Sequence, residues 1–289
     1  MRVCVCVALV CLIATSSAAQ MRPLPDPQPF LQEVRKRLQS DDERQSPYMY
    51  VETRRDMKLD KSGRATSDTV TVAESYPGLP GEPRWMREIS KDGQKVPQRD
   101  LDKADADRRR HVEAYARKLT SNPDEVRAKE AREREKDLRE AAESIDDIFR
   151  IYDIRMIGRE TLDGRDTITF SLTPRSGVKP RTRAGNIMRS LSLRAWISES
   201  DYELARLDIE AIDTVSMGFG LLARLHKGSQ ASFQRRKVND EAWLPAAASY
   251  TLSVRVGLVA VLRRSATFQF SDYRKFSVDT TTAFAPRKP

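Results

Sequence analysis

Hydrophobic and polar residues alternate through most of the second half of the chain. Large apolar side chains take every second position in residues 167–173, 191–197 and 205–211, and strand patterns return in 230–238, 243–256 and 266–271. A period of two places such side chains on one face of a β-sheet. Turn sequences such as Asp163-Gly164 separate neighbouring strands, and no helical crossover long enough for a parallel pair lies between them. The pattern predicts an antiparallel meander between about residues 150 and 276.

A shorter group of strands is predicted nearer the N-terminus. Residues 48–53 and 69–72 alternate, and the intervening Asp60-Lys-Ser-Gly supplies a glycine for a tight hairpin turn. A third strand at residues 85–89 runs into another turn at 91–94. Before these strands, residues 30–38 place their apolar side chains on one helical stripe, which predicts a short amphipathic helix.

Residues 100–148 have a different pattern, in which more than half of the side chains are charged and glycine is absent. We predict two helices here that divide at Asn122-Pro123, because asparagine can cap a helix and proline fits its first turn. The segment is then a helical hairpin inserted between the two groups of strands, with a thin apolar stripe that lies over the sheet. Its charges fit a solvated helix face, and a docking site for a partner protein is the alternative.

The first residues have the pattern of a secretory signal. Residues 1–19 carry a single positive charge at Arg2, an apolar run and a small-residue end at Ser17-Ala-Ala, which predicts cleavage before Gln20. We therefore expect an extracytoplasmic, periplasmic protein with one domain over residues 20–289. All three cysteines lie within the signal, at Cys4, Cys6 and Cys11. The mature chain then has no disulfide and no thiolate metal site.

The charge of the chain predicts an anionic partner. The sequence has a formal net charge of +9, and the excess of basic residues is concentrated after residue 150. Lipid headgroups fit this excess better than nucleic acid does, because the basic residues are scattered over strands and turns without a groove-reading motif. A basic loop between two strands is the best candidate for headgroup contact, with solubility as the alternative reading: Arg175, Lys179, Arg181 and Arg183.

The sequence contains little that indicates catalysis. There is no Gly-x-Ser-x-Gly elbow and no His-Glu-x-x-His motif, and His111 and His226 are isolated from each other and from metal-spaced partners. We predict a protein that is not an enzyme and that uses no cofactor or metal. A hydrolase whose active site is assembled from distant residues remains an alternative.

Several strand and turn sequences resemble one known family. They are Gly158-Arg-Glu-Thr-Leu-Asp-Gly-Arg, Leu172-Thr-Pro, Ala195-Trp-Ile-Ser, Asp201-Tyr-Glu-Leu-Ala-Arg-Leu, Trp243-Leu-Pro and Ser271-Asp-Tyr-Arg-Lys-Phe. Together they resemble the outer-membrane lipoprotein-sorting proteins and their periplasmic carrier relatives. The resemblance implies an α+β fold, a half-open antiparallel β-barrel with helices that cover its concave face, where relatives hold acyl chains. It also implies a functional arginine on the first strand, for which Arg54 and Arg55 are the candidates. The charged insert is longer than the lid of the family.

The resemblance and the apolar face together predict a site for a lipid or an acylated protein. Apolar residues of the strands are the candidate lining, and each would equally suit an ordinary core: Ile168, Phe170, Leu193, Ile197, Leu207, Ile209, Leu252, Val254, Phe268 and Phe270. A glycine-containing apolar stretch adds candidates for ligand or membrane contact, with a buried strand end as the alternative: Met217, Phe219, Leu221 and Leu222. An envelope sensor on the same fold, which binds another protein through the insert, is the rival function.

Overall fold

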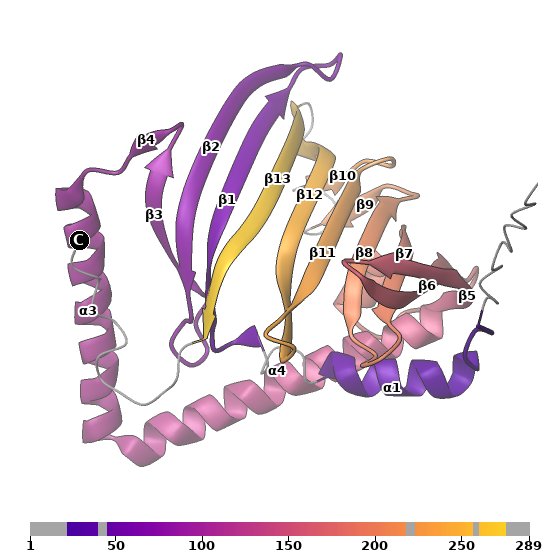
Figure 1. The fold of residues 1–289 in the computed structure, drawn as a ribbon, viewed down its shortest axis with the longest axis horizontal. Helices are drawn as coiled ribbons and strands as arrows, with labels where there is room; N and C mark the ends of the chain where they lie inside the picture. The colour runs from indigo at the N-terminus through magenta and orange to yellow at the C-terminus, as the bar shows by residue number, and fades with distance from the viewer. Residues whose placement is uncertain (1–21, 40–44, 218–222, 257–259, 276–289) are drawn as a thin grey trace, which may run out of the picture.

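The computed structural model describes residues 22–39, 45–217, 223–256 and 260–275, and these form one open antiparallel sheet of 13 strands with helices beside it (Figure 1). This is the α+β fold class expected from the sequence. The predicted signal peptide, Phe219, Leu221 and Leu222 lie outside the described residues. None of the described helices combines the length and the apolar character that a transmembrane helix needs.

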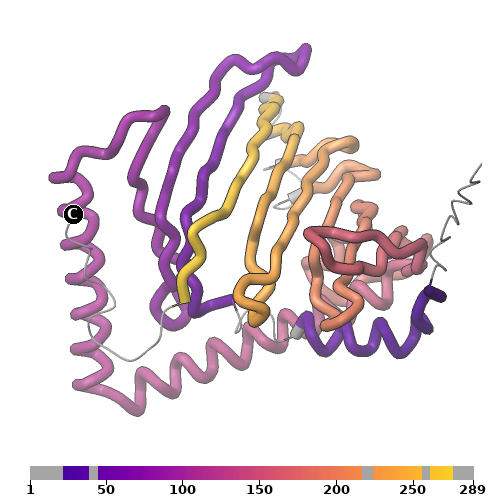
Figure 2. The backbone as a smooth tube through the Cα atoms, in the orientation of Figure 1, coloured from indigo at the N-terminus to yellow at the C-terminus, as the bar shows by residue number. Residues whose placement is uncertain are grey.

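The sheet consists of two meanders joined through the first and last long strands. The N-terminal meander contains β1 (Tyr48–Leu59), β2 (Ala65–Tyr76), β3 (Trp85–Lys91) and β4 (Gln94–Lys95). The C-terminal meander contains β5 (Tyr152–Leu162), β6 (Arg165–Pro174), β7 (Leu191–Ser198), β8 (Leu204–Ala211), β11 (Gln230–Val238), β12 (Ala242–Val256) and β13 (Ala260–Lys275). Pairing of β1 with β13 brings segments from opposite ends of the chain side by side (Figure 2). The predicted meander is confirmed within each group.

A short hairpin of β9 (Val215–Met217) and β10 (Ala223–Leu225) lies off the main strand order and pairs with β12. The sequence analysis named this apolar stretch as a ligand or membrane contact, with a buried strand end as the alternative, and it did not predict a separate hairpin. Three-residue strands are too short to show a period of two.

The helices are α1 (Pro27–Gln39), α3 (Gln98–Ser121), α4 (Pro123–Ile151) and α5 (Arg183–Met188). The two-helix insert is confirmed, with Asn122 between its helices and Pro123 in the first turn of α4. The hydroxyl of Tyr115 donates to Glu130 at 2.6 Å near this junction, and farther from it α3 and α4 diverge (Figure 1). Of the described residues of the two insert helices, those that pack in the main hydrophobic core are at the C-terminal end of α4.

One face of the sheet, which we call the inner face, packs against helices over part of its area. Phe30 and Val34 of α1 and Ile151 of α4 pack against strands β6 and β7. The core residues contributed by those strands are Ile168, Phe170, Leu172, Ala195 and Ile197. The side chains of Ile168 and Phe170 are 0% and 1% exposed. Alternation places Ile168, Phe170 and Leu172 on the inner face as predicted, but Thr167 and Thr169 on the other face of β6 are also buried.

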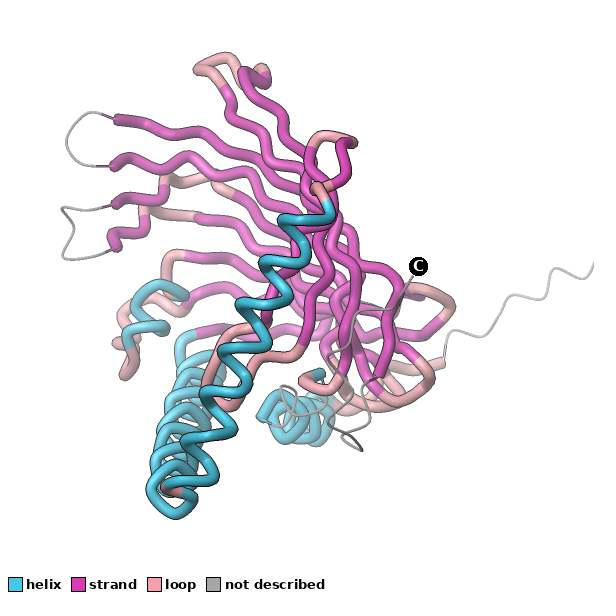
Figure 3. Tube along the Cα trace, turned by 90° about the vertical axis from the view of Figure 1, so that its left-hand side faces the viewer, coloured by secondary structure: helices cyan, strands magenta, loops and turns pink. Residues whose placement is uncertain are grey.

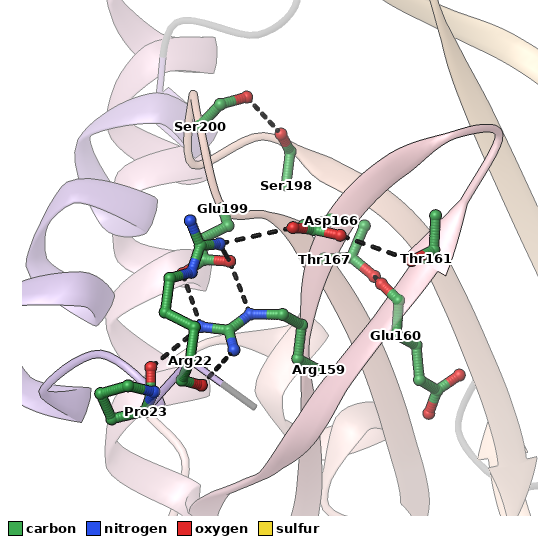
Figure 4. Close-up of polar contacts among 10 residues, drawn as sticks. All are labelled: Arg22, Pro23, Arg159, Glu160, Thr161, Asp166, Thr167, Ser198, Glu199 and Ser200. Carbon is green, nitrogen blue, oxygen red and sulfur yellow. Dashed lines mark hydrogen bonds and ion pairs between the residues drawn. The ribbon is translucent and has the colours of Figure 1, made fainter. Parts of the chain in front are cut away.

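A charged cluster fixes the segment that leads into α1 (Figure 4). Arg159 of β5 donates to the backbone oxygens of Arg22 and Pro23 at 2.5 and 3.0 Å, and to both carboxylate oxygens of Glu199 at 2.8 Å. Arg22 donates to the same carboxylate at 2.6 Å. The hydrogen bond from Arg159, with its charge and that of Arg22, holds the pKa of Glu199 below its usual value despite partial burial. The cluster ties the start of α1 to β5 and to the β7–β8 turn.

A buried carboxylate holds the β6–β7 connection against α4. Asp147 is 1% exposed. It accepts the backbone N–H of Arg181 at 3.0 Å, and both the N–H and the hydroxyl of Thr182 at 2.7 Å. Burial raises the pKa of Asp147, but these hydrogen bonds outweigh burial and hold the pKa below its usual value. The carboxylate therefore stabilises the fold in its charged form.

We predict that Asp147→Asn lowers the free energy of unfolding by about 1–3 kcal/mol at neutral pH, because buried donors lose a charged acceptor. The folded-state pKa is depressed, so this stabilisation is full above the pKa of the unfolded state and is lost as pH falls through the folded-state pKa. The difference between wild type and variant in urea unfolding should shrink in acid below about pH 4. Asp146→Asn is the matched control, because Asp146 is half exposed and forms a surface ion pair with Arg35. Equal losses in the two variants would contradict the assignment.

Candidate functional site

The inner face has a covered part and an open part. On the inner face, α1 and the end of α4 pack against β6 and β7, and the core that they form includes no described residue of β11, β12, β13 or β1. Register connects the two parts, because Phe170, Ala195 and Leu207 lie in one cross-strand row that continues through Phe233 and Phe268. The part of the row up to Leu207 in β8 packs against the helices, and the part on β11, β12 and β13 does not.

The predicted lining residues divide between these two parts. Ile168, Phe170 and Ile197 are core residues under α1 and α4, and Leu193 and Leu207 pack at the edge of that core. The remaining predicted residues with described side chains are half-buried on the open part: Ile209, Leu252, Val254, Phe268 and Phe270. Met217 lies in β9, where only the backbone is described. The sequence analysis weighed a filled core against a ligand site for each residue, and the inner face contains both environments.

Four aromatic rings form a continuous row on the open part, which we call the aromatic row. The rings of Tyr250 and Phe268 are 6.1 Å apart, those of Phe268 and Phe270 are 6.4 Å apart and nearly parallel, and those of Phe270 and Tyr50 are 5.4 Å apart. The row therefore spans β12, β13 and β1. Tyr50 is buried, with the guanidinium group of Arg84 over its ring at 4.6 Å, whereas Tyr250, Phe268 and Phe270 are half-buried. The part of the row on β12 and β13 therefore favours contact with another apolar group.

Charged side chains of β1 border the aromatic row. Arg54 lies over the ring of Phe268 at 5.3 Å and donates to Asp56 at 2.8 Å. Its neighbour Arg55 points to the opposite face, because strand residues alternate, and donates to Asp68 at 2.9 Å. Of the two candidates for the first-strand arginine, Arg54 is thus the one on the inner face. A site of this form offers apolar rings to a chain and charges to a polar head.

Glu52 is paired with Phe270 across β1 and β13 and belongs to the same border. Burial raises the pKa of its carboxyl group, and the nearby charge of Arg54 opposes that rise. A half-buried carboxyl beside an aromatic ring is sensitive to any apolar group that removes more water from it. Its pKa is therefore a reporter for occupation of the aromatic row.

The outer face of the sheet carries a groove of about 550 Å³ across β5 to β12. Its lining is mostly polar and includes Ser171, Ser232, Arg194 and Arg206. Arg206 pairs with Asp208 at 2.9 Å, and Arg194 and Arg206 lie over the ring of Trp196 at 5.4 and 4.8 Å. Leu193 and Ile209, which were predicted as ligand lining, and Tyr250 of the aromatic row also line this groove. Charged and hydroxyl groups interrupt these apolar groups, so the groove offers an acyl chain a less continuous apolar surface than the rings of Phe268 and Phe270 do.

The predicted headgroup residues lie on and beside α5. Arg175, Lys179, Arg181 and Arg183 are all exposed, and none of them takes part in an ion pair between described residues. The backbone of Arg181 is fixed by Asp147, which leaves its side chain at the surface. The four remain candidates for contact with an anionic surface.

Sequence reasoning missed the two tyrosines of the aromatic row. Tyr250 alternates with Leu252 and Val254 in the predicted strand 243–256, so the period of two was a signal for it. For Tyr50, nothing in the sequence shows that β1 pairs with β13. Without that pairing, Tyr50 belongs to a different meander from Phe270. The available signal was the period of two in residues 48–53, which identified the strand and not its neighbour.

Comparison with solved structures returns proteins related to the family that the sequence resembles. An outer-membrane lipoprotein-sorting protein domain from Vibrio parahaemolyticus matches at 10% identity over 89% of this chain and 94% of that chain, with a TM-score of 0.33. A LolA superfamily protein from Nitrosomonas europaea matches at 8% identity over 88% and 97%, with a TM-score of 0.26. The MucA/MucB complex of Pseudomonas aeruginosa matches at 8% identity over 86% and 99%, with a TM-score of 0.24.

No protein-family model matches the chain, and the comparison with curated proteins also gives no match. The structural likenesses have TM-scores below 0.5 and carry no argument about function. The proposals below therefore rest on the residues of this chain.

We predict that the pKa of Glu52 lies above the usual glutamate value and that Arg54→Gln raises it further, because a nearby positive charge is lost. Carboxyl-carbon NMR measured against pH follows this group directly. Arg55→Gln is the matched control, since Arg55 lies on the other face and should leave the Glu52 titration unchanged. An unchanged Glu52 titration in Arg54→Gln would show that Arg54 does not act on this border.

Proposed function

We propose that this chain is an extracytoplasmic, non-catalytic binding protein that holds an acyl chain of a lipid or an acylated protein against the open part of its inner face. The observation that carries the proposal is the run of three half-buried rings, Tyr250, Phe268 and Phe270, on strands outside the core that α1 and α4 form with β6 and β7. The signal pattern of residues 1–19 supports the compartment.

The binding energy comes from removing the acyl chain from water. Each buried methylene contributes about 0.8 kcal/mol, so a chain with about ten buried methylenes gains about 8 kcal/mol before the costs of association. Arg54, Asp56 and Glu52 at the border of the row then select amphipathic ligands, because an apolar chain continues over the rings while its polar end meets charged groups. No bond is made or broken in this process.

We predict that Phe268→Asp lowers the affinity for a fluorescent long-chain fatty acid by at least about tenfold, because it replaces apolar contact with a charge. Thr267→Asp is the matched control. Thr267 is the adjacent residue of the same strand, is exposed and points to the outer face, so it introduces the same charge at the same distance along β13.

Urea unfolding should show both variants folded before affinity is compared. Equal affinity of folded Phe268→Asp and wild type would remove the aromatic row from the site. Equal losses in Phe268→Asp and Thr267→Asp would indicate a general effect of negative charge rather than a contact on the inner face.

Binding of a partner protein through the insert is the second candidate function. Most residues of α4 between 124 and 144 are exposed, and Leu138 is 47% exposed on a helix that diverges from α3. Ile145, Asp147, Ile148 and Ile151 must be kept in any test, because they pack in the core or hold the β6–β7 connection. Leu138→Asp meets this condition. Loss of envelope-protein capture by this variant with unchanged fatty-acid affinity would favour the second candidate.

A further inference from the structure

The edge of the sheet at which the β9–β10 and β12–β13 hairpins end has an unusual composition. The hairpins are neighbours, because β10 pairs with β12, and their strands end at the same edge (Figure 3). We call this the hairpin edge and define it by the described residues Arg224, Arg255, Val261, Leu262, Arg263 and Arg264. Residues 214–238 and 242–271, which supply β9 to β13 here, contain no aspartate or glutamate.

Positive charges face one another at the hairpin edge without acidic neighbours in the same strands. Arg224 lies directly opposite Arg255 in the β10–β12 pair, an arrangement that destabilises a sheet when nothing compensates for it. Arg263 follows two residues after Val261, which is the cross-strand partner of Arg255. In the ion pairs between described residues, Arg255, Arg263 and Arg264 do not appear. Ion pairs between described residues therefore do not explain why Arg255, Arg263 and Arg264 are gathered here.

Exposed apolar side chains lie beside these arginines. Val261 and Leu262 are 40% and 47% exposed, and they are among the most exposed large apolar residues of the described chain. Leu262 pairs with Val254 on the inner face, whereas Arg255 and Arg263 point to the outer face. Val261 shares the outer face with these two arginines, and Arg264 shares the inner face with Leu262. Each face of the hairpin edge therefore combines an exposed apolar side chain with at least one guanidinium group.

The predicted headgroup loop lies at the same edge of the sheet. The loop that contains α5 connects the end of β6, at Pro174, to the start of β7, at Leu191. Leu191 is paired with Ala211, the last residue of β8, and the chain continues from there into the β9–β10 hairpin. The loop and the hairpins therefore lie at the same edge of the sheet (Figure 3). Arg175, Lys179, Arg181 and Arg183 therefore add exposed positive charge to this side of the molecule.

We propose that the hairpin edge is a docking surface for a bilayer of anionic lipids. Val261 and Leu262 enter the apolar boundary of the bilayer, and Arg224, Arg255, Arg263 and Arg264 contact the phosphate groups above it. Charge complementarity favours an anionic surface, and the exposed apolar side chains favour a bilayer over a nucleic acid, which offers no apolar layer. The inner face continues from Leu262 along β13, past Arg264, to Phe268, so docking through this edge places one end of the open part next to the membrane.

Sedimentation of the mature chain, residues 20–289, with lipid vesicles tests this proposal. Vesicles of phosphatidylethanolamine with one quarter phosphatidylglycerol are compared with neutral phosphatidylcholine vesicles at about 0.15 M salt. We expect binding to the anionic vesicles that is much stronger than binding to the neutral ones. Arg255→Gln with Arg263→Gln should weaken anionic binding about 25-fold, at about fivefold for each charge removed near the surface.

Two matched controls separate position from composition. Arg236→Gln with Arg274→Gln removes two exposed arginines from the opposite ends of β11 and β13 and should leave vesicle binding within about twofold of wild type. Leu262→Asn should weaken binding about tenfold, whereas Ile157→Asn, at a residue 46% exposed elsewhere on the sheet, should not.

The proposal is overturned if the folded wild type does not bind anionic vesicles, or if it binds neutral vesicles equally well. It is also overturned if the Arg236 and Arg274 control loses as much binding as the Arg255 and Arg263 variant, because net charge alone would then explain the effect. Binding to an acidic envelope protein without vesicle binding would assign the hairpin edge to a protein partner instead. Fatty-acid affinity is measured separately, so failure of docking leaves the proposed acyl site testable.

Discussion

The sheet of this protein has more apolar inner surface than its helices cover. Helix α1 and the end of α4 bury the covered part of that surface, over β5 to β8, where Ile168 and Phe170 are removed from water. The open part continues in register through Phe233 and Phe268, which do not belong to the core under the helices. The proposed binding site depends on this imbalance, because an uncovered apolar face is costly in water and is stabilised by an apolar group that comes to lie on it.

The charged insert leaves this imbalance in place, because α3 is attached to the opposite face of the sheet. A helical hairpin lying along the inner face would have filled the open part, but α3 and α4 diverge from their junction at Asn122. The attachment of α3 to the sheet is largely ionic: Arg87 joins Asp105 at 2.7 Å and Glu74 at 3.0 Å. Ala73 is paired with Glu52 and therefore lies on the inner face, so its neighbour Glu74 points to the outer face. Because Glu74 and Arg87 form the attachment, α3 meets the face opposite the aromatic row. The apolar stripe of the insert is too thin to displace this arrangement.

Much of the fold could be predicted from the sequence, because alternation and turn chemistry are local. The strands of the C-terminal meander and the division of the insert at Pro123 followed from such local patterns. The β1–β13 pairing did not, since it joins segments more than two hundred residues apart and leaves no trace in periodicity. For the same reason the sequence predicted which apolar residues share the inner face, but not which of them lie under a helix. Phe170 and Phe268 have equivalent patterns in the sequence, and only the position of α1 makes one a core residue and leaves the other open.

The stretches of β9 to β13 that lack aspartate and glutamate show a second effect of strand pairing on the surface. Arginines scattered along residues 214–271 have no evident pattern in one dimension, but antiparallel pairing brings Arg224 opposite Arg255 beside exposed Val261 and Leu262. An apolar face that begins at such an edge and leads to a row of aromatic rings is consistent with a ligand that arrives from a membrane. Chain topology, rather than any single motif, is what unites these features.

The central claim is that an acyl chain lies on the open part of the inner face, and a fatty acid with a nitroxide at the end of its chain tests it most directly. Paramagnetic broadening of assigned NMR signals measures which residues the chain approaches. The account predicts broadening around Tyr250, Phe268 and Phe270, with Thr267 and the outer-face groove around Arg194 little affected. Broadening confined to the outer groove or to the α3–α4 insert, or none at saturating fatty acid, would contradict it.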